Sequence, residues 1–188
     1  MDTRKCCAIG ISGEISSGKT TIAKRLADNH GFGFISFGEF IRYKAEISHI
    51  PPSRENYQNL GNHLMRELNP EVFLKECIEH FSPNSRIHVF DGVRHESIVY
   101  ELRHIYGSCF IVFIEADVRL RYQRYRERDR AEDQLLTLDQ FASLSKHPVE
   151  QDVVRIAKSA NLLINGNDEL AVQETSIMRL LRNSDCAK

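Results

Sequence analysis

The sequence predicts an α/β fold in which helices cover both faces of a parallel β-sheet. Short β-branched or aromatic runs alternate with helical patterns along the chain, which favours parallel strands joined by right-handed crossovers. Several of these runs are almost continuously apolar, as is typical of strands buried on both faces. The chain has 188 residues, which is enough for one domain with a substantial core and too few for two.

The expected elements follow one another in a regular order. Five short runs rich in β-branched, aromatic or small apolar residues are predicted strands: Cys6–Ser12, Phe32–Phe37, Arg86–Asp91, Cys109–Glu115 and Asn161–Asn165. Stretches with helical patterning lie between and after them: Gly18–His30, Phe37–Ile47, Ser53–Glu67, Glu71–Phe81, His95–Tyr106, Val118–Arg128, a stretch near Leu138–Ser159, and Asp168–Leu181. Pro51-Pro52 and the segment 82–85 are predicted turns within one domain, not linkers.

The composition narrows the function classes. Hydrophobic residues make up 41%, charged residues 27%, and the net charge is −1. This balance gives no electrostatic case for a nucleic-acid or membrane-surface partner. No apolar run approaches the roughly 20 residues of a bilayer span, and the segment 1–5 does not resemble a secretion signal, so we expect a cytoplasmic protein. Five cysteines, with Cys6 and Cys7 adjacent, suggest a reduced compartment and mostly small buried side chains, not a disulfide framework.

A glycine-rich loop follows the first predicted strand. Its letters, GEISSGKT at 13–20, fit the pattern G-x-x-x-x-G-K-S/T. Backbone N–H groups of such a turn and the positive end of the next helix hold anionic oxygens. Lys19 adds a charge where β- and γ-phosphates would lie, and the Thr20 hydroxyl is a ligand for Mg²⁺. The alternative, a glycine-rich hairpin with an incidental lysine, is disfavoured by the flanking strand and helix. We therefore predict a site for ATP and Mg²⁺ built from Gly13, Ser16, Ser17, Gly18, Lys19, Thr20 and Thr21.

Two further segments place charged residues after strands. The first, ISFGEFIR at 35–42, resembles the S-x-G-D/E-x-I/L-R segment that binds the acceptor in adenylate-kinase-like nucleoside monophosphate kinases. The resemblance implies that Arg42 holds the acceptor's phosphate; the alternative is a solvated helix arginine. The second, VFDGVR at 89–94, resembles the D-G-x-P-R segment of the same kinases but lacks the proline. Asp91 can hold a magnesium-bound water or cap a helix, and Arg94 can bind a phosphate bidentately.

An arginine-rich helix follows the fourth predicted strand. Six arginines fall within the 13 residues 118–130, beside an apolar stripe of Val118, Tyr122 and Tyr125. We expect Arg119, Arg121 and Arg126 to lie on a solvated, charged face of this helix. In the kinases that the chain resembles, such a helix brings arginines to the transferring phosphoryl group, and Arg124 and Arg128 match best. Arg130 begins the loop 129–134, which we expect to close as a short lid.

The order of these segments resembles that of P-loop nucleotide kinases. The segments 53–56, 91–94, 128–133, 137–141 and 160–165 are most similar to those of dephospho-CoA-kinase-like and predicted nucleotide kinases. Arg54, Gln58, Gly61 and Arg66 also resemble the R-x-x-x-Q-x-x-G stretch of deoxynucleoside monophosphate kinases, which implies that Arg54 binds the acceptor. The resemblance implies a three-layer α/β/α sandwich with strand order 2-3-1-4-5 and ligands at the carboxyl ends of the strands. It implies a single kinase domain over 1–188, with an acceptor-binding helical region at about 38–82 and a lid at about 126–136.

The resulting hypothesis is a kinase that moves the γ-phosphoryl of MgATP to a small phosphorylated acceptor, a (deoxy)nucleoside monophosphate or dephospho-CoA. Lys19, Asp91, Arg124 and Arg128 are the expected catalytic residues, and Thr20 and Asp91 the expected residues on the metal side. A hydroxyl acceptor such as the ribose of dephospho-CoA needs a base, a second candidate role for Asp91, whereas a phosphate acceptor needs none. The alternative is a P-loop ATPase or regulatory switch that acts with a macromolecular partner. The sequence leaves the acceptor and the oligomeric state open.

Overall fold

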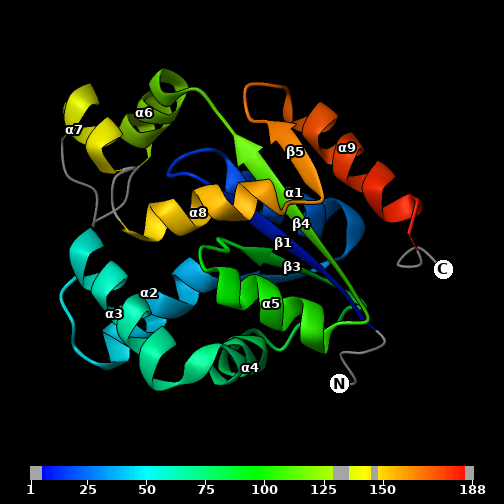
Figure 1. The fold of residues 1–188 in the computed structure, drawn as a ribbon, viewed down its shortest axis with the longest axis horizontal. Coiled ribbons are helices and arrows are strands. Elements are labelled where there is room, and N and C mark those ends of the chain that lie inside the picture. Colours follow the sequence, from blue (N-terminus) through cyan, green and yellow to red (C-terminus); the bar gives the residue numbers. More distant parts are fainter. Residues whose placement is uncertain (1–5, 129–135, 145–147, 185–188) are drawn as a thin grey trace.

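The computed structural model describes residues 6–128, 136–144 and 148–184 (Figure 1). Five parallel strands form one sheet in the order β2-β3-β1-β4-β5. The predicted fold class and strand order are therefore confirmed. Because β1 lies between β3 and β4, the loop after β1 opens at the middle of the sheet's carboxyl edge, where such sheets bind ligands.

The observed elements lie close to the predicted ones. The strands are β1 Cys7–Gly13, β2 Gly33–Ser36, β3 Ile87–Asp91, β4 Ser108–Glu115 and β5 Leu162–Asn165. The helices are α1 Lys19–His30, α2 Phe37–Ile47, α3 Arg54–Glu67, α4 Asn69–Phe81, α5 Glu96–Ile105, α6 Val118–Glu127, α7 Leu138–Ser143, α8 Pro148–Lys158 and α9 Leu170–Arg182.

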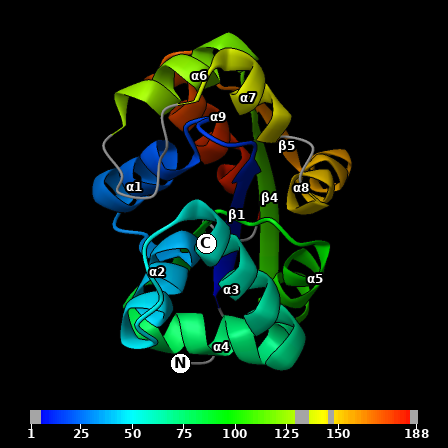
Figure 2. The same cartoon turned by 90° about the vertical axis from the view of Figure 1, so that its left-hand side faces the viewer.

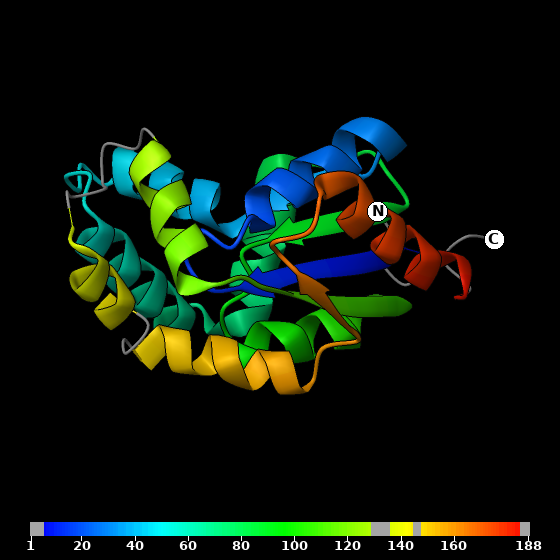
Figure 3. The ribbon, with the colours of Figure 1, turned by 90° about the horizontal axis from the view of Figure 1, so that it is seen from above.

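Helices cover the sheet on both sides, which gives three layers. Figure 3 shows α1 and α9 on one side of the sheet and α5 and α8 on the other. Successive side chains of a strand point to opposite faces, so Ile9 and Ile11 of β1 pack with α1 and α9, whereas Ala8 packs on the opposite face. All seven residues of β1 are buried, as the almost continuous apolar pattern predicts for a central strand.

Two helical groups stand near the carboxyl edge of the sheet. Figure 2 shows α2, α3 and α4 at one end of the molecule and α6 and α7 at the other, with β1 and β4 between them. Phe37 and Phe40 of α2 and Phe73 of α4 pack into the core on the α5 side of the sheet. The α2–α4 group is thus anchored to the sheet, and it corresponds to the segment predicted to bind the acceptor.

The structure refines one expectation. The helical stretch near Leu138–Ser159 consists of two helices, α7 and α8. Pro148 is the first residue of α8, a position that suits proline because the first turn needs no N–H hydrogen bond. Among the described residues, no helix has the length and apolar character that a membrane crossing requires.

Most of the cysteines lie in the core. Cys6 and Cys77 are buried free thiols and Cys109 is a partly buried one, as predicted for most of them. The side chain of Cys7 is also buried. Cys6 packs into the core on one face of the sheet and Cys7 into the core on the other, which separates these neighbours in the sequence.

Candidate functional site

The glycine-rich loop turns between the end of β1 and the start of α1. Three of its residues have positive φ angles: Gly13 at 145°, Ser16 at 60° and Gly18 at 105°. A Cβ atom on Gly13 would lie 2.5 Å from the carbonyl oxygen of Ile114, so both the backbone conformation and the space require glycine there. Positive φ angles of this kind occur in the backbone conformations that bind anions through successive N–H groups.

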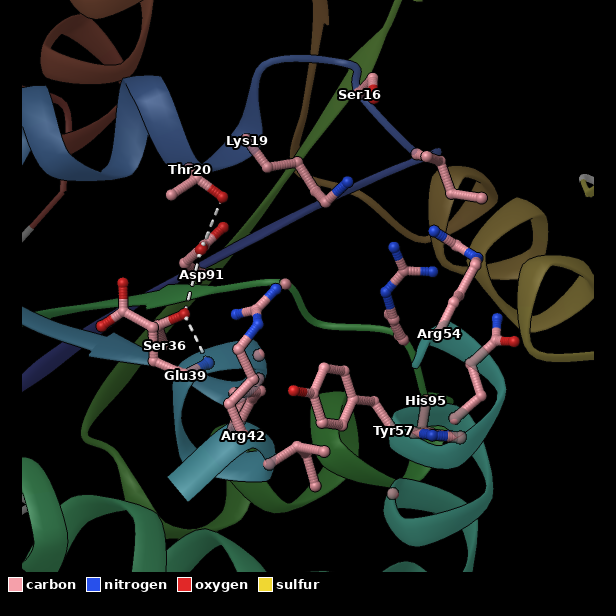
Figure 4. A pocket seen from close by; sticks show the side chains of 18 of the residues that line it. Ser16, Lys19, Thr20, Ser36, Glu39, Arg42, Arg54, Tyr57, Asp91 and His95 are labelled. Atoms are coloured by element: carbon pink, nitrogen blue, oxygen red, sulfur yellow. Dashed lines mark hydrogen bonds between the residues drawn. The ribbon is translucent and has the colours of Figure 1, made fainter. Parts of the chain in front are cut away.

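Lys19 begins α1, and only 8% of the residue is exposed. Its Nζ donates a hydrogen bond to the backbone carbonyl of Glu14 at 2.6 Å, so the ammonium group reaches back across the loop. Figure 4 shows the Lys19 side chain extending below the stretch of loop that carries Ser16. A phosphate group in the loop would compete with the Glu14 carbonyl for this ammonium.

Asp91 joins the loop to the start of α2. The Thr20 hydroxyl donates to Asp91 Oδ2 at 2.9 Å, and the Ser36 hydroxyl donates to the same oxygen at 3.2 Å. Figure 4 shows this chain of hydrogen bonds continuing to the backbone N–H of Glu39. The geometry follows from the sheet, since Ser36 and Asp91 are paired residues at the carboxyl ends of β2 and β3.

The second oxygen of Asp91 bears on the question of a metal. Oδ1 is buried and has no hydrogen-bond partner among the described residues, although buried polar atoms are normally paired. Carboxylate and hydroxyl oxygens are the hard ligands that Mg²⁺ prefers. Asp91 Oδ1 and the Thr20 hydroxyl therefore fit the metal predicted between them. The helix-cap alternative for Asp91 is wrong, because the N-cap of α5 is His95.

A cavity of about 400 Å³ extends from the phosphate loop to the α2–α3 group. It brings together most residues that the sequence analysis selected: Ser16, Gly18, Lys19, Thr20, Thr21, Arg42, Arg54, Asp91, Arg94, Arg124 and Arg128. Gly13 and Ser17 are not in its lining. Gly13 belongs to β1, and a Cβ on it would lie 2.7 Å from the buried Ser17 Oγ, which places the Ser17 side chain behind the loop.

The far half of the cavity has a different character. Apolar side chains of Ile41, Met65, Phe73 and Ile98 line it together with the amides of Gln58 and Asn62. The Arg42 guanidinium lies 5.8 Å from the ring centre of Tyr57, a cation–π distance. Arg42 and Arg54 extend from α2 and α3 toward the phosphate loop (Figure 4). The cavity thus has a strongly cationic end and a largely apolar end.

Arg124 of α6 and Arg128, the C-cap residue of this helix, have different surroundings. Arg124 donates to the backbone carbonyls of Ser17 at 3.1 Å and Gly166 at 2.9 Å, which ties α6 to the phosphate loop and to the segment after β5. The Arg128 guanidinium lies 4.7 Å from the ring centre of Tyr125. The expected lid at 129–134, with Arg130, lies outside the described residues.

Arg121 contradicts the sequence analysis, which placed it on a solvated face. Only 5% of the residue is exposed, and its Nη2 lies 3.1 Å from Glu14 Oε2. Arg119 and Arg126 are exposed as predicted. The signal that was missed is spacing: Arg121 stands three residues after Val118 and four before Tyr125, within the apolar stripe.

His95 is a further lining residue that sequence reasoning missed. Its Nδ1 lies 3.7 Å from Asp152 Oδ2 on α8. Burial lowers the pKa of His95, an effect that Asp152 opposes and Arg94 reinforces. His95 is therefore a neutral imidazole at neutral pH in a cavity otherwise rich in cations. Its only sequence signal was its position next to Arg94.

Comparisons with known proteins agree with this picture of the fold. Residues 9–140 match the family model described as AAA domain. A UPF0200 protein from Pyrobaculum aerophilum is 28% identical over 127 residues, which cover 68% of this chain and 69% of that protein. Shikimate kinase from Aquifex aeolicus superposes with a TM-score of 0.60 at 18% identity, covering 94% of this chain and 96% of the other. Deoxyadenosine kinase from M. mycoides, solved with bound dCTP, has a TM-score of 0.58 at 14% identity, covering 94% and 100%.

Proposed function

The chain belongs to the AAA domain family and has the fold of P-loop kinases, and from these premises we propose that it is an ATP-dependent kinase. In this proposal it transfers the γ-phosphoryl group of MgATP to a small phosphorylated acceptor, either a (deoxy)nucleoside monophosphate or dephospho-CoA. The observation that carries the proposal is one cavity in which the phosphate loop faces arginines from three separate segments.

On the donor side, the phosphate loop and Lys19 bind the β- and γ-phosphates, and Arg128 neutralises charge that develops during transfer. Thr20 and Asp91 hold Mg²⁺, which supplies charge neutralisation between the phosphates when bound. Phosphoryl transfer depends mainly on positioning and on charge stabilisation, and these residues provide both. Arg124, which already donates to two backbone carbonyls, contributes by fixing α6 against the loop.

On the acceptor side, Arg42, Arg54 and Arg94 bind an anion that the substrate already has. A single arginine in the cavity could be incidental. These three guanidinium groups, however, come from three separate segments: α2, α3 and the segment after β3. The apolar half of the cavity, with Gln58 and Asn62, suits a flat body that has hydrogen-bonding groups at its edge. This combination favours a nucleoside monophosphate among the acceptors, and such an acceptor needs no general base.

The test is a panel of acceptors incubated with MgATP and analysed by mass spectrometry for the gain of one phosphoryl group. We expect kcat/KM for a phosphorylated acceptor to exceed that for the matching unphosphorylated nucleoside by about 10²-fold, because each charge-assisted hydrogen bond contributes about 1.5–3 kcal/mol. Arg42→Ala should reduce this preference about tenfold or more while ATP binding changes little. Arg66→Ala, an exposed arginine of α3 outside the cavity, is the matched control.

Two outcomes would contradict the proposal. Equal use of phosphorylated and unphosphorylated acceptors would mean that these arginines do not read an anion on the acceptor. ATP hydrolysis without phosphorylation of any small molecule would favour the alternative, an ATPase or regulatory switch that acts with a macromolecular partner.

A further inference from the structure

His95 stands in the wall of the cavity, immediately before α5 (Figure 4). It is the N-cap of this helix, yet its side chain accepts no hydrogen bond from the described N–H groups of the first turn. Ile98, whose N–H donates to the His95 carbonyl at 3.1 Å, lines the apolar half of the cavity. Residues three apart share one face of a helix, so the imidazole borders the half in which the body of the acceptor is proposed to bind.

The two ring nitrogens of His95 have different surroundings. Nδ1 lies 3.7 Å from Asp152 Oδ2 of α8, and no described residue of α8 belongs to the lining of the cavity. Nε2 forms no hydrogen bond with any residue that the structure describes. Because Nδ1 faces α8, Nε2 is the nitrogen that a molecule bound in the cavity can meet.

Asp152 decides which of these nitrogens carries the proton. Arg155 Nη1 donates to Asp152 Oδ1 at 3.0 Å, and the other oxygen, Oδ2, faces the imidazole. A carboxylate beside one ring nitrogen favours the tautomer that has its proton there. Burial lowers the pKa of His95, so the ring is neutral at neutral pH and its proton is on Nδ1. Nε2 is then a hydrogen-bond acceptor, whereas the arginines of the cavity can only donate.

We propose that His95 Nε2 accepts a hydrogen bond from an amino group on the base of the acceptor, and that Asp152 is the positioning residue that keeps this nitrogen free of a proton. A carbonyl at the same ring position would instead place two hydrogen-bond acceptors against each other, which is unfavourable when both are buried. The site would thus select adenine or cytosine over hypoxanthine or uracil. This inference rests on the proposed function, because it assumes that the cavity binds a nucleotide acceptor.

The test compares acceptors that have either an amino group or a carbonyl at one ring position: AMP with IMP, CMP with UMP, and dephospho-CoA with its deaminated form. In each pair that the wild type phosphorylates with MgATP, kcat/KM for the amino member should be about tenfold or more higher, because the carbonyl member leaves Nε2 without a donor. His95→Phe should abolish this preference. His104→Phe, at an exposed histidine of the same helix, is the matched control and should keep it.

Asp152→Asn separates the role in proton placement from a merely structural one. Because Arg155 binds Oδ1, the new amide nitrogen should take the place of Oδ2 and donate to His95 Nδ1. The imidazole proton then moves to Nε2, which becomes a donor, so the preference should shift about tenfold or more toward the carbonyl members. Asp28→Asn, at an exposed aspartate of α1 outside the lining of the cavity, is the matched control.

The outcomes separate the two levels of the proposal. If the wild type phosphorylates none of these acceptors or other nucleotides, the proposed function fails and the inference fails with it. If it phosphorylates one but shows no preference for an amino group, or keeps the preference in His95→Phe, the inference is wrong while the proposed function stands. An equal loss of kcat/KM for both members of a pair in Asp152→Asn would show that Asp152 serves only the structure. Should Asp152→Asn not fold, His95→Phe still decides whether Nε2 reads the base.

Discussion

At the scale of single residues, Lys19 of the phosphate loop is the first position to test. It is largely buried, and its ammonium group donates a hydrogen bond to the backbone carbonyl of Glu14. A carbonyl satisfies the hydrogen bond without neutralising the charge, so a phosphate oxygen would be the better partner.

Lys19→Ala should therefore lower kcat for the best acceptor by about 10²-fold, the usual cost of losing one group that stabilises the transition state. Thermal unfolding should shift only slightly, because the lost hydrogen bond is worth about 1 kcal/mol. The measurement is steady-state turnover beside a melting curve, with the exposed Lys75→Ala as the control. Full activity in Lys19→Ala would contradict the placement of the triphosphate in this loop.

At the scale of elements, the start of α2 connects the acceptor helices to the donor site. Ser36 is the N-cap of α2, where its hydroxyl accepts from the Glu39 N–H and donates to Asp91. Thr137 is the N-cap of α7, with a complete capping box, and α7 contributes no residue to the lining of the cavity. The two caps share the same local chemistry but differ in their distance from the site.

Ser36→Ala and Thr137→Ala should each destabilise the fold by about 1 kcal/mol, the usual cost of losing an N-cap. Only Ser36→Ala should also raise the Mg²⁺ concentration needed for half-maximal turnover, since only it loses a hydrogen bond that orients Asp91. Chemical denaturation and a Mg²⁺ titration of activity measure the two effects. The same Mg²⁺ dependence in both variants would show that Ser36 is a helix cap and nothing more.

At the scale of the whole molecule, a buried histidine makes stability depend on pH. His88 is 1% exposed, and its Nε2 donates to the Ser85 carbonyl while its Nδ1 faces the Tyr106 hydroxyl at 2.6 Å. Burial raises the pKa of Tyr106, so the phenol stays protonated and can donate to the neutral imidazole. Burial also lowers the pKa of His88 from its ordinary 6.5. Both ring nitrogens of neutral His88 are thus satisfied within the protein.

The free energy of unfolding should fall as the pH drops below about 6.5, because the unfolded chain binds a proton at His88 that the folded chain resists. His95, whose pKa burial also lowers, acts in the same direction, and the slope is at most about 1.4 kcal/mol per pH unit for each histidine. Urea unfolding between pH 8 and 5.5 measures it, and His88→Gln should flatten the curve. Parallel curves for wild type and variant would contradict the assignment.

A second group extends this acid sensitivity. Glu174 of α9 accepts hydrogen bonds from Arg25 and Asn29 of α1, and these contacts, that of Arg25 first, lower its pKa from 4.5. A carboxylate with a lowered pKa stabilises the fold above its unfolded value and loses that contribution as the pH falls. The stabilisation that these Glu174 contacts provide between α1 and α9 should therefore be lost at a lower pH than the stabilisation that depends on neutral His88.

The sequence was informative wherever a local pattern decides the structure. The strand boundaries could be predicted to within one or two residues because each strand is an apolar run that ends in polar or turn residues. The loop at 13–20 follows the spacing G-x-x-x-x-G-K-S/T, which few structures other than phosphate-binding loops require. The strand order, in contrast, came from the resemblance to nucleotide kinases, because no local pattern states that β1 pairs with β3 and β4.

Contacts between segments that are far apart in the sequence could not be predicted from local sequence patterns. The apolar stripe of its helix distinguishes Arg121 from the exposed Arg119 and Arg126, but no local pattern indicates that its partner is Glu14 of the phosphate loop. The partnership of His95 with Asp152 joins helices far apart in the sequence and could not be inferred from either residue. The helix-cap alternative for Asp91 stayed open until the structure placed the N-cap of α5 at His95.

The strand order also governs how the chain can fold while it is being made. β1 and β2 are synthesised before β3, but they do not pair with each other, and both pair with β3, which is complete only at Asp91. At about 5–20 residues per second, roughly 4–16 s separate the synthesis of Gly13 from that of Asp91. During that time the seven residues of β1 that end in the core have no strand partner in the nascent polypeptide. The strand that precedes the phosphate loop therefore gains its first strand partner only after the residues up to Asp91 have been made.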